Sequence, residues 1–167
     1  PARGKASGDA WRGGCCLSCM LPKVVVPLDG SPLAEEALDV ATALAKRVVL
    51  LHVVTPGLAF ATSFVAAERK RAAEHLQRLA VSLRKRGIEA ETLVRAGEPS
   101  RVIAAEARRA KVALIVMSSH GRTGAREFSF GSVAERVIRR SRVPVLLLRG
   151  RRRRPVRRIL VTLDGSG

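Results

Sequence analysis

The sequence contains no tyrosine, and aromatic residues make up only 3% of its 167 residues. Because proteins usually bind single-stranded nucleic acid by stacking bases on aromatic rings, this scarcity argues against such a platform. Long hydrophobic runs are also missing, since charged residues interrupt every apolar stretch before it reaches the roughly 20 residues of a membrane-crossing helix. The sequence therefore predicts neither a base-stacking surface nor a transmembrane segment.

Cysteine is scarce, and the three that occur, Cys15, Cys16 and Cys19, all lie near the beginning of the chain. No fourth ligand of the right type lies near them, which argues against a zinc site. The absence of a disulfide framework elsewhere fits a reducing compartment, so we expect a cytoplasmic protein. Residues 1–19 also lack hydrophobic periodicity, and Met20 resembles a natural start. We therefore expect residues 1–19 to be a disordered or non-native extension.

Acidic residues are outnumbered, with 14 Asp and Glu against 31 Lys and Arg, which gives a formal net charge of +17. The densest basic segment, RGRRRRPVRR, covers residues 149–158. Such a run can neutralise nucleic-acid phosphates or bind an anionic surface. The alternative, which we favour, is a solvated linker, because no aromatic residue lies nearby.

Hydrophobic periodicity predicts strands that alternate with helices. Strand-like runs lie at 24–26, 48–54, 88–94, 112–117 and 143–148, and helical spacing lies at 32–46, at 63–86, after 97–100, and before 140. This alternation predicts an α/β fold, with one three-layer, doubly wound domain over residues 20–149 and a five-stranded parallel sheet in the order 3-2-1-4-5. Pro144 in the last run favours a sheet edge.

In this strand order, the first and fourth strands are neighbours at the switch point, where an α/β sheet is expected to bind its ligand. The loop after the fourth strand contains small residues that let main-chain N–H groups approach a phosphate, and a helix follows it. Ser118, Gly121, Gly131 and Ser132 are the candidates, with Arg122 as a charge partner.

Two other positions have two interpretations each, and two histidines also need an explanation. Asp29, after the first strand, can bind ribose hydroxyls or a divalent ion, or it can cap the next helix. The main chain of Val53 can pair with a purine edge or simply end its strand. His52 and His120 lack a Ser or Cys nucleophile that can be assigned to them, so we expect structural roles. With no paired carboxylates either, binding is expected rather than catalysis, with slow hydrolysis of a bound nucleotide at most.

The beginning of the domain is repeated near the end of the chain. Val24–Ser31 (VVVPLDGS) recurs as Ile159–Ser166 (ILVTLDGS). A repeat displaced by the length of a domain predicts a tandem protein. We therefore expect residues 150–157 to form an arginine-rich linker and residues 158–167 to begin a truncated second unit.

Several segments together resemble the universal stress protein family: Met117-Ser118-Ser119-His120-Gly121, then Gly131-Ser132-Val133 nine residues later, then Arg142–Leu146, together with Val24–Ser31. The resemblance covers about residues 22–149. It implies an adenine-nucleotide alpha-hydrolase-like fold that binds ATP, ADP or AMP, with Mg²⁺ held indirectly near Asp29. Ser118 replaces the first glycine of the family's phosphate loop. The implied site residues are Pro27, Leu28, Asp29, Val53, Met117, Ser118, Gly121, Arg122, Gly131, Ser132 and Val133.

The resemblance also implies partners and a role. Members of this family suggest a homodimer through the fifth strand, here Val143–Leu148, or a pseudo-dimer with a second unit. The implied role is a nucleotide-dependent regulator in a stress response. Two alternatives remain open: a nucleotide-independent interaction domain of the same fold, which Ser118 allows, and nucleic-acid binding through Arg151–Arg154.

Overall fold

The computed structural model describes residues 20–56, 62–119 and 131–149. Its strands are β1 (Val24–Pro27), β2 (Arg47–Val54), β3 (Glu89–Ala96), β4 (Leu114–Ser118) and β5 (Val145–Leu148). Its helices are α1 (Pro32–Glu35), α2 (Ala37–Leu44), α3 (Thr62–Lys85), α4 (Pro99–Arg109) and α5 (Ser132–Arg140). The expected N-terminal extension (1–19), linker (150–157) and second unit (158–167) lie outside the described residues.

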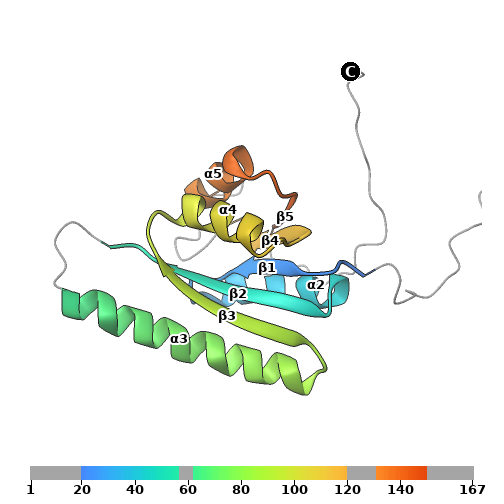
Figure 1. Cartoon of the computed structure of the whole chain (residues 1–167), viewed down its shortest axis with the longest axis horizontal. Helices are drawn as coiled ribbons and strands as arrows, with labels where there is room; N and C mark the ends of the chain where they lie inside the picture. Colours follow the sequence, from blue (N-terminus) through green and yellow to red (C-terminus); the bar gives the residue numbers. More distant parts are fainter. Residues whose placement is uncertain (1–19, 57–61, 120–130, 150–167) are drawn as a thin grey trace, which may run out of the picture.

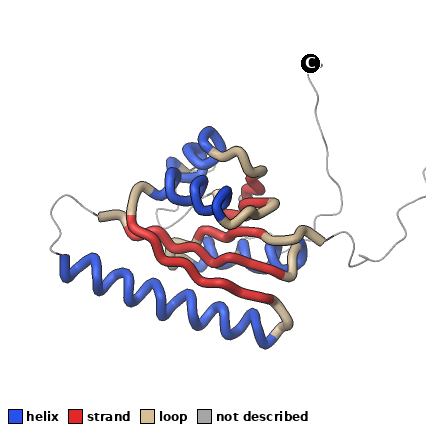
Figure 2. The backbone as a smooth tube through the Cα atoms, viewed as in Figure 1, coloured by secondary structure: helices blue, strands red, loops and turns tan. Residues whose placement is uncertain are grey.

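The five strands form one sheet in the order β3-β2-β1-β4-β5, which confirms the predicted fold (Figure 2). Every pairing is parallel, and β1 lies at the centre: Val24 is opposite Val48 on one side and Leu114 on the other. A parallel sheet places the carboxyl ends of all its strands at one edge. The ends of β1, β2 and β4 therefore meet.

Helices cover both faces of the sheet, because the buried strands carry apolar residues on both faces. Val24 and Val26 of β1 pack in one cluster with α1, α2 and α3, whereas Val25 packs in a second cluster with α4 and α5. Figure 1 shows α3 on one side of the sheet and α4 with α5 on the other. The result is a three-layer domain. Within the described part, none of the helices has the length and apolar character to cross a membrane.

Most elements begin or end one or two residues from their predicted boundaries, and two of the differences have a clear local cause. The single helix expected over 32–46 is divided at Glu36 into α1 and α2, and it ends at Leu44. It stops there because Ala45 adopts an extended backbone and forms a parallel bridge with Leu21. The last strand begins at Val145 rather than at Val143, because the Ser141 hydroxyl bonds both the N–H and the C=O of Val143 in a turn.

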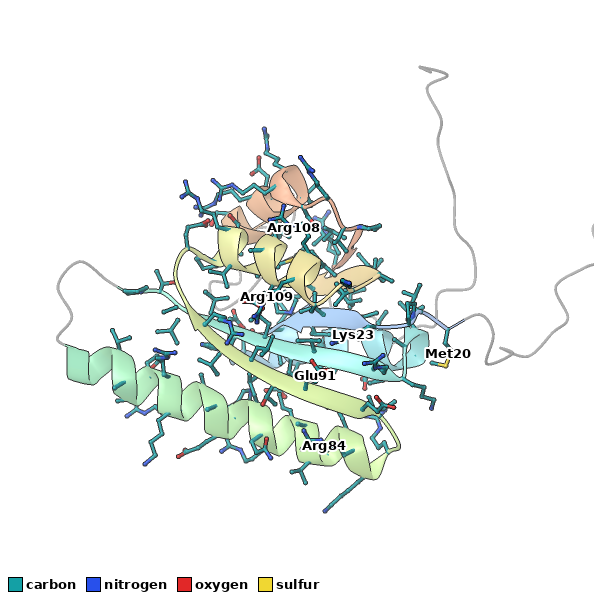
Figure 3. All side chains as sticks on the ribbon, in the orientation of Figure 1. Met20, Lys23, Arg84, Glu91, Arg108 and Arg109 are labelled. Carbon is teal, nitrogen blue, oxygen red and sulfur yellow. The ribbon has the colours of Figure 1, made fainter. Side chains whose placement is uncertain are left out.

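Polar contacts attach the outer elements to the sheet. Lys23 Nζ lies 3.0 Å from Glu91 Oε1, which links the start of β1 to β3 (Figure 3). The Glu106 carboxylate of α4 accepts hydrogen bonds from Arg95 Nε of β3 at 2.8 Å and from Arg109 Nε at 2.9 Å. Burial raises the pKa of Glu106, but the hydrogen bonds from Arg95 and Arg109 outweigh it and hold the pKa below 4.5.

The lowered pKa of Glu106 predicts a contribution to stability under acid. A carboxyl whose pKa is lower in the folded than in the unfolded state stabilises the fold above the unfolded pKa, and this stabilisation is lost as the pH falls through the folded pKa. We therefore expect Glu106→Gln to flatten the decline in unfolding free energy below about pH 4.5. Urea denaturation at several pH values measures this decline. Parallel curves for the variant and the wild type would contradict the prediction.

Candidate functional site

A cavity of about 610 Å³ opens at the carboxyl edge of the sheet. This volume lies within the range of small-molecule sites, roughly 300–1,000 Å³. Residues from β1, β2, β4 and from four helices or their approaches line it: Pro27, Leu28, Asp29, Ala34, Leu51, His52, Val53, Val54, Thr55, Val65, Glu68, Pro99, Ile103, Met117, Ser118, Ser119, Gly131, Ser132, Val133 and Ala134. The cavity therefore lies at the switch point between β1 and β4.

The turn after β1 places a carboxylate at the cavity. Asp29 Oδ1 accepts hydrogen bonds from Ser31 N–H at 2.9 Å and from the Ser31 hydroxyl at 2.6 Å. The same Ser31 hydroxyl oxygen accepts from Ala34 N–H and so caps α1. Gly30 has a φ of +81°, a conformation that favours glycine and lets the chain turn sharply here. Ser31 and not Asp29 therefore caps α1, while Asp29 holds Ser31 in the turn and lines the cavity.

The end of β2 presents a main-chain edge toward the end of β1. Successive residues of a strand direct their N–H and C=O groups to opposite neighbours. The Leu51 carbonyl accepts from Leu28 N–H on the β1 side, and the Val54 carbonyl accepts from Gly97 N–H on the β3 side. Val53 must then direct its N–H and C=O toward the β1 side, beyond the last residue of β1. A donor and an acceptor of Val53 consequently face the region where the cavity opens.

One hydrogen bond joins β4 to the start of α5. Ser119 N–H donates to the Leu148 carbonyl of β5 at 2.8 Å, and Gly131 N–H donates to the Ser119 carbonyl at 2.8 Å. Gly131 is also the N-cap of α5, since its carbonyl accepts from Glu135 N–H at 3.0 Å. The two ends of the segment between residues 119 and 131 are therefore held together, and Ser118 and Ser132 both line the cavity.

The first turn of α5 supplies hydrogen-bond donors. The N–H groups of Ser132, Val133 and Ala134 precede the first intrahelical hydrogen bond, and no side chain in the described chain caps this helix. All three residues line the cavity. The positive end of the helix dipole adds to these donors, and together they favour an anion.

In the described part of the cavity lining, the charged side chains have one sign. Among the lining residues that the structure describes, Asp29 and Glu68 carry carboxylates, and none is Lys or Arg. The described ranges also contain no group of three or more residues suited to hold a metal ion. Asp29 by itself fits only a Mg²⁺ ion whose other ligands come from water and phosphate oxygens, which is how Mg²⁺ is usually held.

The predicted site residues that fall in the described ranges all line this cavity: Pro27, Leu28, Asp29, Val53, Met117, Ser118, Gly131, Ser132 and Val133. Gly121 and Arg122 lie outside the described residues. His52 lines the cavity as well and is buried. No candidate was predicted in α3 or α4, yet Val65 and Glu68 of α3 and Pro99 and Ile103 of α4 take part. Topology could have indicated them, because each helix that follows a parallel strand begins at the carboxyl edge.

Known proteins resemble this chain in sequence and in fold. The universal stress protein YxiE of Bacillus subtilis is 32% identical over 148 residues, which cover 78% of this chain and 100% of the relative. The solved structure of MJ0577 from Methanocaldococcus jannaschii is 28% identical with a TM-score of 0.63, and it covers 80% of this chain and 99% of that one. A universal stress protein family protein of Arabidopsis thaliana, solved with AMP bound, has a TM-score of 0.53 at 19% identity, over 77% of this chain and 91% of that one.

The match extends over the whole described domain. The family model described as "Universal stress protein family" matches residues 20–149, from the residues before β1 through those after β5. The same range contains the parallel sheet, both helical layers and the cavity at the switch point. By sequence and by fold, this chain belongs to the universal stress protein family.

Proposed function

We propose that this chain binds an adenine nucleotide in the cavity at the carboxyl edge of the sheet. The observation that carries the proposal is the arrangement of three kinds of group around one cavity: the main-chain edge of Val53, the carboxylate of Asp29 and the uncapped first turn of α5. These groups match the base, the ribose and the phosphates of a nucleotide respectively. The Arabidopsis relative solved with AMP bound lends further support.

The proposed contacts follow from the chemistry of each group. Val53 N–H donates to N1 of adenine and its carbonyl accepts from the exocyclic amine. Asp29 accepts from a ribose hydroxyl or binds a Mg²⁺ ion held by the phosphates. The N–H groups at Gly131–Val133 and the hydroxyls of Ser118 and Ser132 bind the phosphates, together with Gly121 and Arg122 of the predicted loop.

The proposed role is regulatory: the bound state of the domain controls its partners during a stress response, with ATP hydrolysed slowly at most. We propose the cytoplasm as its location. β5 pairs with β4 on one side and forms an edge of the sheet, and its four residues are half-buried. This edge supports a homodimer through the fifth strand, or a pseudo-dimer with the expected second unit. Nucleic-acid binding through Arg151–Arg154 concerns residues outside the described ranges.

Isothermal titration of the protein with ATP, AMP and GTP tests the proposal. We expect both adenine nucleotides to bind, and GTP to bind at least about tenfold more weakly. Guanine presents N1–H and O6 where adenine presents N1 and an amine, so a donor would meet Val53 N–H and an acceptor would meet Val53 C=O. Addition of Mg²⁺ should strengthen ATP binding more than AMP binding. Absence of binding at millimolar nucleotide by a folded sample would refute the proposal and favour the nucleotide-independent interaction domain.

A further inference from the structure

A two-residue segment between β3 and α4, Gly97–Glu98, contacts elements at both ends of the proposed nucleotide. Gly97 N–H donates to the carbonyl of Val54 at 3.0 Å, next to the main-chain edge of Val53. Gly97 has a φ of +143°, and a Cβ there would lie 3.0 Å from Cγ2 of Val102. Both observations favour glycine at this position, where the chain turns from β3 toward Glu98.

Glu98 caps α4 and also reaches α5. Its carboxylate accepts from the N–H groups of Ser100 and Arg101 at 3.2 and 3.0 Å and from the Ser100 hydroxyl at 2.8 Å. From α5, Arg140 Nη1 donates to it at 2.7 Å and Arg136 Nη1 at 3.4 Å. Arg140 also contacts the hydroxyl of Ser100, which is fully buried. Burial raises the pKa of Glu98, but the hydrogen bonds from Ser100 and Arg101 and the charge of Arg140 outweigh it and hold the pKa below its ordinary value.

Arg136 extends this network to the cavity. While its Nη1 faces Glu98, its Nε donates to the carbonyl of Ser132 at 2.9 Å. Ser132 is the first residue of α5 and lines the cavity, as does Pro99, which follows Glu98 in the chain. A planar guanidinium holds two acceptors at a fixed separation, which an ammonium group does not do. The start of α5 is thus connected to the start of α4 through Arg136.

We propose that Glu98 and Arg136 are positioning residues that set where the first turn of α5 lies relative to the main-chain edge of Val53. This proposal rests on the proposed function, because it concerns recognition of the same nucleotide. Neither residue is among those that line the cavity. Each acts through the N–H groups of α5, so its loss weakens the phosphate contacts and spares the contacts to the base.

Glu98→Gln tests the proposal when adenosine, AMP and ATP are titrated separately. We expect affinity for AMP and ATP to fall about tenfold, the size of one misplaced charge-assisted hydrogen bond, and affinity for adenosine to change less than about threefold. Glu106→Gln is a matched control, because Glu106 is also a glutamate that accepts from two arginines, but these are Arg95 of β3 and Arg109 of α4, and Glu106 does not line the cavity. It should change none of the three affinities.

Arg136 provides a second, independent variant. Arg136→Lys keeps the charge but cannot bridge Glu98 and Ser132, so it should reproduce the selective loss of AMP and ATP binding. Arg139→Gln is its control on the same helix, since Arg139 pairs with Glu135 at 2.9 Å. If Glu98→Gln does not fold, the comparison of Arg136→Lys with Arg139→Gln tests the proposal in its place. Equal losses for adenosine and AMP, or equal effects of a variant and its control, would overturn the proposal. Wild-type protein that binds none of the three ligands would overturn the proposed function itself.

Discussion

Leu76→Ala is expected to lower the free energy of unfolding by about 3 kcal/mol, within the range of about 2–5 kcal/mol for such truncations. Leu76 lies on α3, is fully buried and belongs to the cluster that joins α3 to the sheet. Alanine favours helix at least as strongly as leucine, so the loss must come from packing and from the cavity left behind. α3 is long but mostly polar, and a limited set of apolar residues attaches it to β2 and β3.

Thermal or urea denaturation measures this loss. For a chain of this size, about 3 kcal/mol corresponds to a fall in melting temperature of about 6–12 °C. Val81→Ala on the same helix is the control, because 42% of Val81 is exposed, and its effect should stay within about 0.5 kcal/mol. If both variants lost the same stability, α3 would not be held by its buried face.

Gly131→Leu is expected to weaken binding of ATP and AMP by about 10- to 100-fold with the fold intact. Gly131 has φ −58° and ψ 145°, an extended conformation that any residue adopts, so a side chain causes no backbone strain. It lines the cavity and precedes the donors of Ser132 and Val133. A leucine side chain there restricts access to those N–H groups, and each charge-assisted hydrogen bond that is lost costs about 1.5–3 kcal/mol.

Titration calorimetry measures the affinity, and circular dichroism of the same samples verifies the fold. Gly131→Ala is the graded control: its methyl group should weaken binding less than leucine does. A variant that is folded and binds AMP as tightly as the wild type would show that the phosphates do not lie at the start of α5. Lost binding together with lost structure in both variants would show instead that Gly131 is needed for folding.

The fold could be predicted from the sequence because its signals are local and strong. Val24–Val26 and Val48–Val54 are apolar or nearly so on both faces, and such short runs are typical of the buried strands of a parallel sheet. The strand order followed from their alternation with helices and from the handedness of crossovers. Element ends were less predictable. The helix ends before Ala45 because Ala45 forms a parallel bridge with Leu21. A local sequence pattern does not predict a contact between residues so far apart in the chain.

The candidate site was predictable to the extent that its residues lie at the ends of strands. Asp29, Val53 and Ser118 each follow or end a predicted strand, so the strand order alone placed them at one edge. The place of Glu68 at the cavity could not be predicted in this way, because its position in an amphipathic helix resembles that of any solvated glutamate. Its place at the cavity depends on how the first turns of α3 lie beside the end of β2.

By itself, the sequence determined the layers, the parallel sheet and the edge at which a ligand is expected, because hydrophobic periodicity and small-residue loops depend only on near neighbours. The tertiary structure alone decided that Glu98 caps α4 and also contacts Arg136 and Arg140 of α5. Along the chain, Glu98 lies 38 residues from Arg136 and 42 residues from Arg140. Only the packing of two helices on one face of the sheet brings such side chains within hydrogen-bonding distance.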